Sequence, residues 1–166
     1  MLLLALTGSL ATGKSTVSAL LSQPPYNLPI IDADILAREV VEPGTPGYKK
    51  IVNHFASSTP NLLLPSPTER KGRPLNRAAL GRRVFGSTHS RQRDRKILNS
   101  IVHPAVRYAM ARSILYHYFC GYWAVVLDIP LLYDSRLDIF APVVLMVAAN
   151  SARSDVEATV ARSAFE

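Results

Sequence analysis

The sequence predicts an α/β fold in which a doubly wound parallel sheet carries helices on both faces. Three observations predict it. Four short apolar runs lack the polar–apolar alternation of half-exposed strands, as expected for parallel strands that are covered on both sides. These runs are residues 2–6, 29–31, 123–128 and 143–147. Helix-forming segments separate them, and a glycine-rich loop joins the first run to the first helical segment.

The helical segments follow from their start and stop signals. A helix over residues 14–22 comes after the glycine-rich loop. Further helices are expected over residues 34–41, 48–55, 77–85 and 91–102, and from Pro104 to about Cys120. Pro104 suits the first position of a helix because proline lacks an N–H there at no cost. We therefore predict one domain over residues 1–166 that contains a helical insertion over residues 42–121.

Size and composition exclude several classes of protein. A chain of 166 residues with 48% hydrophobic and 19% charged residues suits one globular core rather than a disordered chain. The single cysteine, Cys120, forms no internal disulfide; we interpret it as a core or interface residue in a reducing, cytoplasmic compartment. Residues 114–127 are uncharged but too short to span a bilayer, so they predict a buried helix end followed by a buried strand. No basic region accompanies the apolar N-terminus, so we expect no signal peptide.

The net charge of +7 is concentrated in the middle of the chain. Residues 68–112 contain twelve of the nineteen Lys and Arg residues and only two acidic residues, Glu69 and Asp94. Such a field suits a polyanion, which is either nucleic acid or a small ligand with several phosphates. Nucleic acid is not expected as a partner because the basic run contains no recognised motif and no interleaved aromatic residues.

The segment Gly8–Thr16 matches the pattern G-x-x-x-x-G-K-[ST] between a strand and a helix. Its glycines allow successive backbone N–H groups to surround phosphate oxygens, and the helix N-terminus adds partial positive charge. Lys14 can reach the β- and γ-phosphates, and the Ser15 hydroxyl can ligate Mg²⁺. The alternative is a plain glycine turn. The sequence therefore predicts ATP and Mg²⁺ as cofactors, with the nucleotide bound by Gly8, Ala11, Thr12, Gly13, Lys14, Ser15 and Thr16.

Acidic residues follow two other predicted strands, and the carboxyl ends of parallel strands are where such folds bind ligands. A phosphoryl acceptor needs a carboxylate that orients its hydroxyl and takes the proton, and we assign Asp34 to this role. Asp32 is expected to point away from Asp34 and to support the Mg²⁺ waters or the loop, and one of the two is expected to cap the following helix. Asp128 is either a second Mg²⁺ ligand or a helix cap. Arg38, one turn after Asp34, either binds substrate phosphate or is solvated.

Two segments outside the glycine-rich loop carry a resemblance to a known family. One is I-D-A-D-I-L-A-R-E-V-V-E-P-G over residues 31–44. The other joins L-N-R-A-A-L-G over residues 75–81, the I-V-H-P step at 101–104 and D-I-P-L-L-Y-D over 128–134. In this order and spacing they resemble the dephospho-CoA kinases over about residues 3–148.

The resemblance implies a nucleoside-monophosphate-kinase-like P-loop fold and a transferase of coenzyme A biosynthesis. ATP·Mg²⁺ would phosphorylate the ribose 3′-hydroxyl of dephospho-CoA, giving coenzyme A and ADP. The helical insertion would form the substrate-binding subdomain. Together with this, we expect the substrate to be bound by Asp34 and Arg38 ahead of the insertion and by Arg77 and His103 within it. Several of Arg73, Arg77, Arg82 and Arg83 would neutralise its diphosphate.

The sequence departs from the family pattern after residue 148. The lid and the last strand of the family are not recognised, and residues 155–165 are expected to form one short helix. Two alternatives to dephospho-CoA kinase activity therefore stay open. One is a non-catalytic ATP-binding remnant or regulatory module without the lid, and the other is another small-molecule P-loop kinase. The oligomeric state is not predicted.

Overall fold

The computed structural model describes residues 1–8, 12–65, 72–129, 143–149 and 156–162. Five strands form one sheet in the order β2-β3-β1-β4-β5. Their bounds are β1 Leu2–Gly8, β2 Ile30–Asp32, β3 Ala124–Asp128, β4 Val143–Ala149 and β5 Val156–Arg162. The helices are α1 Lys14–Ser22, α2 Ala33–Glu39, α3 Pro46–Phe55, α4 Arg77–Val84 and α5 His89–Phe119.

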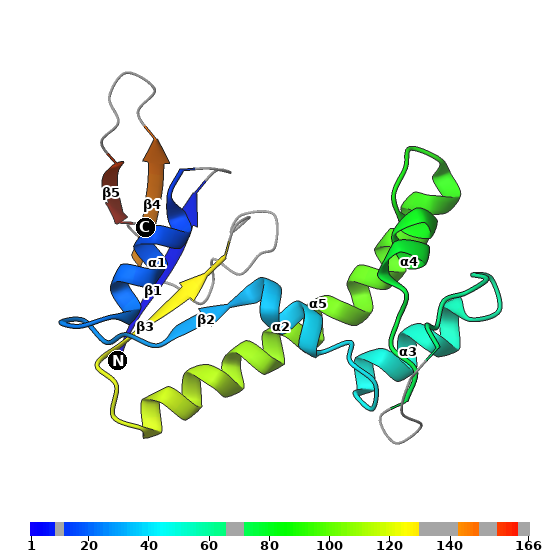
Figure 1. Cartoon of the computed structure of the whole chain (residues 1–166), viewed down its shortest axis with the longest axis horizontal. Helices are drawn as coiled ribbons and strands as arrows, with labels where there is room; N and C mark the ends of the chain where they lie inside the picture. The colour runs from blue at the N-terminus through cyan, green and yellow to red at the C-terminus, as the bar shows by residue number, and fades with distance from the viewer. Residues whose placement is uncertain (9–11, 66–71, 130–142, 150–155, 163–166) are drawn as a thin grey trace. The chain divides into compact units, whose positions relative to one another are not determined.

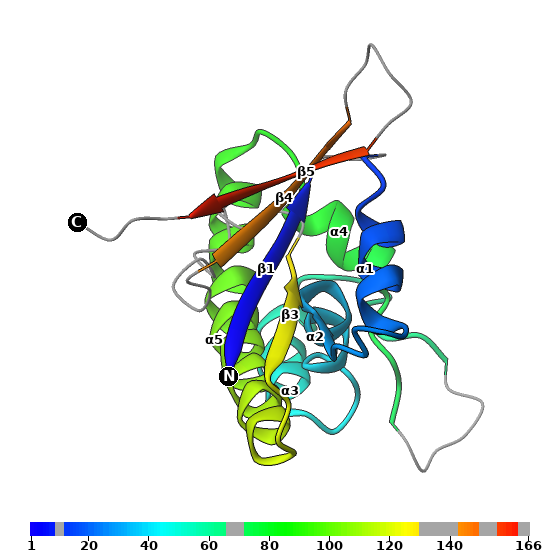
Figure 2. The same ribbon diagram turned by 90° about the vertical axis from the view of Figure 1, so that its left-hand side faces the viewer.

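The first four strands of this order are mutually parallel, which confirms the predicted α/β fold with a parallel sheet. Figure 2 shows β3, β1, β4 and β5 next to one another in this order. Helix α1 and the last turns of α5 lie on opposite sides of these strands (Figures 1 and 2). In the sheet order, the connection from β1 to β2 runs through α1 in one direction, and the connection from β2 to β3 runs back through α5 in the other. Because connections between parallel strands are right-handed, connections in opposite directions place their helices on opposite faces of the sheet.

The expected helix over residues 155–165 is wrong. This segment contains β5, which pairs antiparallel with β4 from Val143 opposite Arg162 to Ala149 opposite Val156. The β-branched residues of its sequence favour a strand, and the edge of β4 supplies unpaired N–H and C=O groups to pair with.

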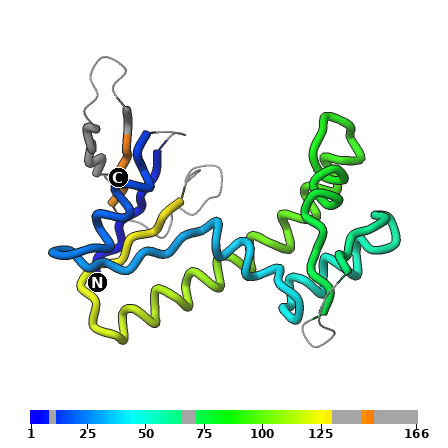
Figure 3. Tube along the Cα trace, in the orientation of Figure 1, coloured from blue at the N-terminus to red at the C-terminus, as the bar shows by residue number. Residues whose placement is uncertain are grey.

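The chain divides into two units, residues 1–34 with 110–166 and residues 35–109. It leaves the first unit through α2 and returns through α5, as the Cα trace shows (Figure 3). The predicted helical insertion over residues 42–121 shares residues 42–109 with the second unit. Each unit has its own apolar cluster, around Leu6, Val126 and Val147 in the first and around Ile51, Phe55 and Leu80 in the second.

Helix α5 differs from the sequence predictions in two ways, which are its continuity through Pro104 and the exposure of its C-terminal end. The two helices predicted over residues 91–102 and from Pro104 are one continuous helix with Pro104 inside it. A proline within a helix costs about 3 kcal/mol or more because it removes one hydrogen bond and crowds the preceding turn. Burial of Val106 and Met110 after the proline offsets that cost, together with the packing of Ile101 and Val102 before it against the apolar cluster of the second unit.

The end of α5 is exposed, whereas the sequence predicts a buried helix end. The exposed fractions are 65% for Tyr116, 82% for Phe119 and 63% for Trp123, and Cys120 is also exposed rather than in the core. Strand β3 is buried at every position. The predicted buried strand began one residue earlier, at Trp123, which is exposed and precedes β3. In the described part of the chain, no helix combines the length and the apolar character needed to cross a membrane.

Candidate functional site

The glycine-rich loop begins at the end of β1 and finishes at the start of α1. Gly13 has φ +83° and ψ +13°, a left-handed conformation that glycine adopts without strain. Its carbonyl oxygen accepts hydrogen bonds from the N–H groups of Thr16 at 2.9 Å and Val17 at 3.1 Å, which starts α1. Ser15 and Thr16 are exposed in the first turn of this helix, and Ala11 lies outside the described residues.

Gly8 ends β1 where no larger residue fits. A Cβ atom at this position would lie 2.7 Å from the backbone oxygen of Val147 and 2.9 Å from Oγ1 of Thr12. The first contact is with backbone of the neighbouring strand β4, which has little freedom to move. Only glycine therefore fits at this end of the loop, because β4 approaches the backbone of Gly8 too closely for a side chain.

Lys14 and Asp128 form an ion pair in which Nζ of Lys14 donates to Oδ1 of Asp128. Both side chains are largely buried, with exposed fractions of 17% and 10%. The sheet explains the contact, because Asp128 is the register partner of Leu6 on β1, the strand that leads into the loop. Sequence reasoning gave each residue a role but missed the pair. The expectation that β1 and β3 end at the same edge of the sheet was the signal that could have indicated this ion pair.

Asp32 and Asp34 lie at the same edge of the sheet. Asp32 is the register partner of Asp128, so the ends of β2 and β3 meet there. Oδ1 of Asp32 accepts a hydrogen bond from the backbone N–H of Asp34 at 2.8 Å. The expectation that Asp32 points away from Asp34 is therefore wrong, because helix α2 starts directly at Ala33 and extended strand geometry does not continue. Asp32 acts as the helix cap, and the exposed Asp34 carboxylate lies in the first turn of α2.

We expect Asp32→Ala to lower the free energy of unfolding by about 1 kcal/mol, because it removes the oxygen that caps α2. Asp32→Asn keeps an oxygen of the same geometry and is expected to lie within about 0.5 kcal/mol of the wild type. Urea unfolding followed by circular dichroism measures both. Glu39→Ala, an exposed carboxylate at the other end of α2, is the matched control. Equal losses for Asp32→Ala and Asp32→Asn would contradict the capping role.

The other predicted substrate residues belong to the second unit. Arg38 is exposed in the last turn of α2, and Arg77 is the exposed first residue of α4. His103 is exposed inside α5 rather than ahead of a helix start. Arg73 donates through Nε and Nη2 to the backbone oxygens of Leu64 and Leu63, both at 3.2 Å, which gives it a structural role within its unit.

The first unit offers oxygen donors that fit Mg²⁺, the ion implied by a nucleotide site of this kind. Ser15, with its hydroxyl, is the second residue of α1, and Asp128, with its carboxylate, is the last residue of β3. Among the residues that the structure describes, no group of three or more His, Cys, Asp or Glu side chains could hold a metal ion. Mg²⁺ bound with a nucleotide needs no such cage, because it takes one or two protein oxygens and completes its shell with phosphates and waters. The donor set is therefore suitable.

Comparisons with known proteins agree with the resemblance to the dephospho-CoA kinases that the sequence motifs indicate. The model of the dephospho-CoA kinase family matches residues 2–166. The chain is 48% identical over 147 residues to the dephospho-CoA kinase CAB5 of Saccharomyces cerevisiae, which covers 89% of this chain and 56% of that protein. It is 43% identical over 160 residues to a dephospho-CoA kinase of Bacillus cereus, covering 96% of this chain and 72% of that protein.

Solved structures show the same likeness. The structure of a dephospho-CoA kinase from Campylobacter jejuni superimposes with a TM-score of 0.64 at 25% identity, covering 87% of this chain and 64% of that one. The chain thus spans only part of the length of several of these relatives, about half in the case of the yeast protein. The family model extends over the glycine-rich loop, the strand ends and the helical unit alike. This chain belongs to the dephospho-CoA kinase family.

Proposed function

We propose that this chain transfers the γ-phosphoryl group of ATP to the 3′-hydroxyl of the ribose of dephospho-CoA, which yields coenzyme A and ADP. Membership of the dephospho-CoA kinase family supports this reaction. The observation that carries it is the meeting of three strand ends at one edge of the sheet, with Lys14 paired to Asp128 and Asp32 beside Asp128. Phosphoryl transfer requires a cation for the donor phosphates and a carboxylate for the acceptor hydroxyl at one place.

Lys14 would bind the β- and γ-phosphates of ATP. Lys14 is the first residue of α1, and the N-terminus of a helix favours negative charge such as that of a phosphate. To reach the phosphates, Lys14 would exchange its contact with Asp128 for a contact with a phosphate oxygen. The phosphate oxygens carry more charge than one carboxylate, and charge-assisted hydrogen bonds to them are strong.

Mg²⁺, when bound with ATP, would neutralise charge that develops on the phosphate oxygens during transfer. Ser15 and Asp128 would hold it, Ser15 through its hydroxyl and Asp128 through its carboxylate. Release of Asp128 from Lys14 would make that carboxylate available. The two exchanges are therefore linked, because both use the same ion pair.

Asp34 would orient the acceptor hydroxyl and accept its proton. Its carboxylate is exposed in the first turn of α2, and its backbone N–H is held by Asp32. The cap fixes the position of the Asp34 backbone relative to the end of β2. A general base of this kind contributes about 10²- to 10⁴-fold to the rate.

The test is a transfer assay with purified chain, ATP, Mg²⁺ and dephospho-CoA in which ADP and coenzyme A are both quantified. We expect equal amounts of the two products, and no turnover when dephospho-CoA is replaced by coenzyme A, whose 3′-hydroxyl is already phosphorylated. Nucleotide affinity is measured separately with a fluorescent ATP analogue. Binding of ATP without formation of coenzyme A would contradict the proposal, as would ADP formation that is independent of the acceptor.

A further inference from the structure

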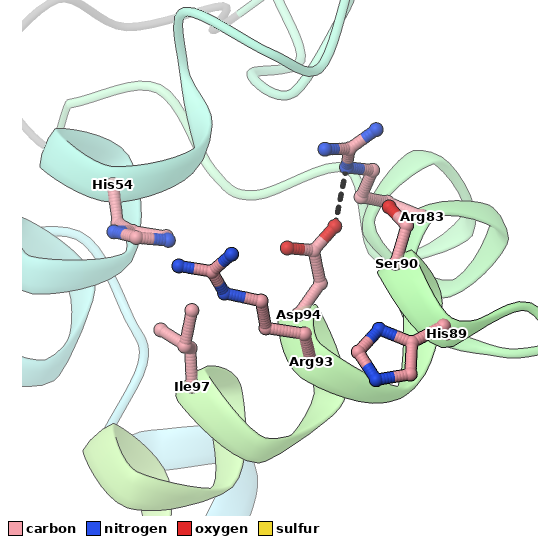
Figure 4. A pocket seen from close by; sticks show the side chains of 7 residues that line it. All are labelled: His54, Arg83, His89, Ser90, Arg93, Asp94 and Ile97. Carbon is pink, nitrogen blue, oxygen red and sulfur yellow. Dashed lines mark ion pairs between the residues drawn. The ribbon is translucent and has the colours of Figure 1, made fainter.

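The second unit contains a cavity of about 400 Å³ where the ends of α3 and α4 meet the start of α5. Figure 4 shows the side chains that line it. Four of them are basic: His54 from α3, Arg83 from α4, and His89 and Arg93 from α5. The volume lies within the range of cavities that bind small molecules. None of the residues that we assign to phosphoryl transfer lines it.

Two of these basic side chains have a structural reason for their position. His54 and Arg83 lie in the last turns of α3 and α4, where the helix dipole favours positive charge. Arg83 is also neutralised, because its Nε lies 2.8 Å from Oδ2 of Asp94. Asp94 is the acidic residue of the cavity lining, so this pair uses the negative charge that is present there.

The charge at the start of α5 is explained only in part by such contacts. The positive end of a helix dipole favours acidic residues, yet the first turn of α5 has none. Its first eight residues instead include five basic ones, which are His89, Arg91, Arg93, Arg95 and Lys96. Two of these have contacts of their own with Phe85, because Nη1 of Arg91 donates to its backbone oxygen at 3.3 Å and the guanidinium of Arg95 lies 5.9 Å from the centre of its ring. No carboxylate of the described residues lies within ion-pair distance of Arg93. Local electrostatics therefore opposes the arrangement, and such conflicts are expected where a ligand binds.

An anion in the cavity would resolve the conflict. The first N–H groups of an α-helix have no partner within the helix, and His89 and Ser90, the first two residues of α5, line the cavity. Arg93 adds a planar guanidinium that can donate two parallel hydrogen bonds, and Ser90 adds a hydroxyl. Backbone N–H groups, a hydroxyl and an arginine together are the donors of phosphate sites at helix N-termini.

We propose that this cavity binds the phosphate group of a phosphorylated small molecule through Arg93, Ser90, His89 and His54. The phosphate could come from the diphosphate of the acceptor substrate or from a separate phosphorylated compound that acts as an effector. The chemistry recognised is the same in both cases. The binding itself does not depend on the proposed kinase function; only its assignment to the acceptor does.

The experiment is an NMR titration of the ¹⁵N-labelled full chain with inorganic phosphate, at an ionic strength held constant with sodium chloride. We expect saturable shifts of the His89 and Ser90 backbone amides. Phosphate at the glycine-rich loop is read separately from the Gly13 and Ser15 amides. Arg93→Gln is expected to weaken the binding reported by His89 and Ser90 at least tenfold and to leave the loop titration unchanged.

Arg95→Gln is the matched control, because it removes the same charge from the same helix two residues away and does not line the cavity. We expect it to change the dissociation constant less than twofold. Thermal unfolding of both variants checks that the fold is intact, and Ser90→Ala, which is expected to weaken binding without removing a charge, is the second variant. Equal effects of Arg93→Gln and Arg95→Gln, or no saturation of His89 and Ser90, would overturn the proposal.

The source of the phosphate is resolved by kinetics on the same variants. If the acceptor supplies it, Arg93→Gln raises the KM for dephospho-CoA about tenfold and leaves kcat unchanged. If an effector supplies it, KM is unchanged while phosphate binding is still weakened. Failure of the proposed kinase function would leave the NMR result intact, so the two proposals fail independently.

Discussion

We expect Lys14→Met to lower kcat/KM for ATP-dependent formation of coenzyme A by about 10³-fold. Removal of one charged donor that stabilises the transferring phosphoryl group typically costs this much. Methionine keeps most of the length of the side chain, so the loss reports on charge rather than on packing. Initial rates at varied ATP concentration measure it.

The same substitution tests the ion pair with Asp128. Without Lys14, the Asp128 carboxylate is left 90% buried and unpaired, and breaking such a pair costs about 3 kcal/mol. Adding Asp128→Asn to Lys14→Met removes the unpaired charge and is expected to recover most of the unfolding free energy, while activity stays lost. If the double variant regained activity, Lys14 would have no role beyond holding Asp128.

Asp34→Asn is expected to lower kcat by about 10²- to 10⁴-fold, because the amide can no longer accept the proton of the acceptor hydroxyl. ATP affinity should stay within twofold of the wild type, since Asp34 is not part of the glycine-rich loop. Stability should change little because the side chain is exposed and asparagine is tolerated in the first turn of a helix. Steady-state kinetics and binding of an ATP analogue separate the two effects.

Glu39→Gln provides the matched control for Asp34→Asn. It removes one exposed carboxylate from the same helix and is expected to leave kcat within twofold. A comparison with Asp32→Asn distinguishes the neighbouring acids, because that variant keeps the helix cap but loses the charge beside Asp128. Unchanged turnover of Asp34→Asn would remove this residue from its proposed role.

The parallel strands were predictable because each is short, apolar and bounded by clear breaks. The register could then be anticipated in outline, since parallel strands of a doubly wound sheet end at one edge, and Asp32 and Asp128 are indeed paired there. Helix α5 was predicted as two helices because local propensity treats Pro104 as a start signal. The burial of Val106 and Met110, which overrides that signal, depends on contacts distant in sequence.

Strand β5 and the cap of α2 show the limits of pattern reasoning at shorter range. The segment that forms β5 has no clear periodicity, and its strand conformation depends on the edge that β4 offers. Asp32 and Asp34 are both suited to capping, and only the immediate start of α2 at Ala33 decides between them. The basic cavity could not be foreseen either, because its lining comes from three helices and its charge excess depends on Asp94 pairing with Arg83.

The most direct test of the account is a crystal structure of this chain with a non-hydrolysable ATP analogue, Mg²⁺ and dephospho-CoA. We predict that Nζ of Lys14 leaves Asp128 and binds the β- and γ-phosphate oxygens, and that the Asp34 carboxylate lies within hydrogen-bond distance of the ribose 3′-hydroxyl. A structure in which Lys14 stays on Asp128 with the nucleotide bound elsewhere, or in which another group contacts the 3′-hydroxyl, would contradict it.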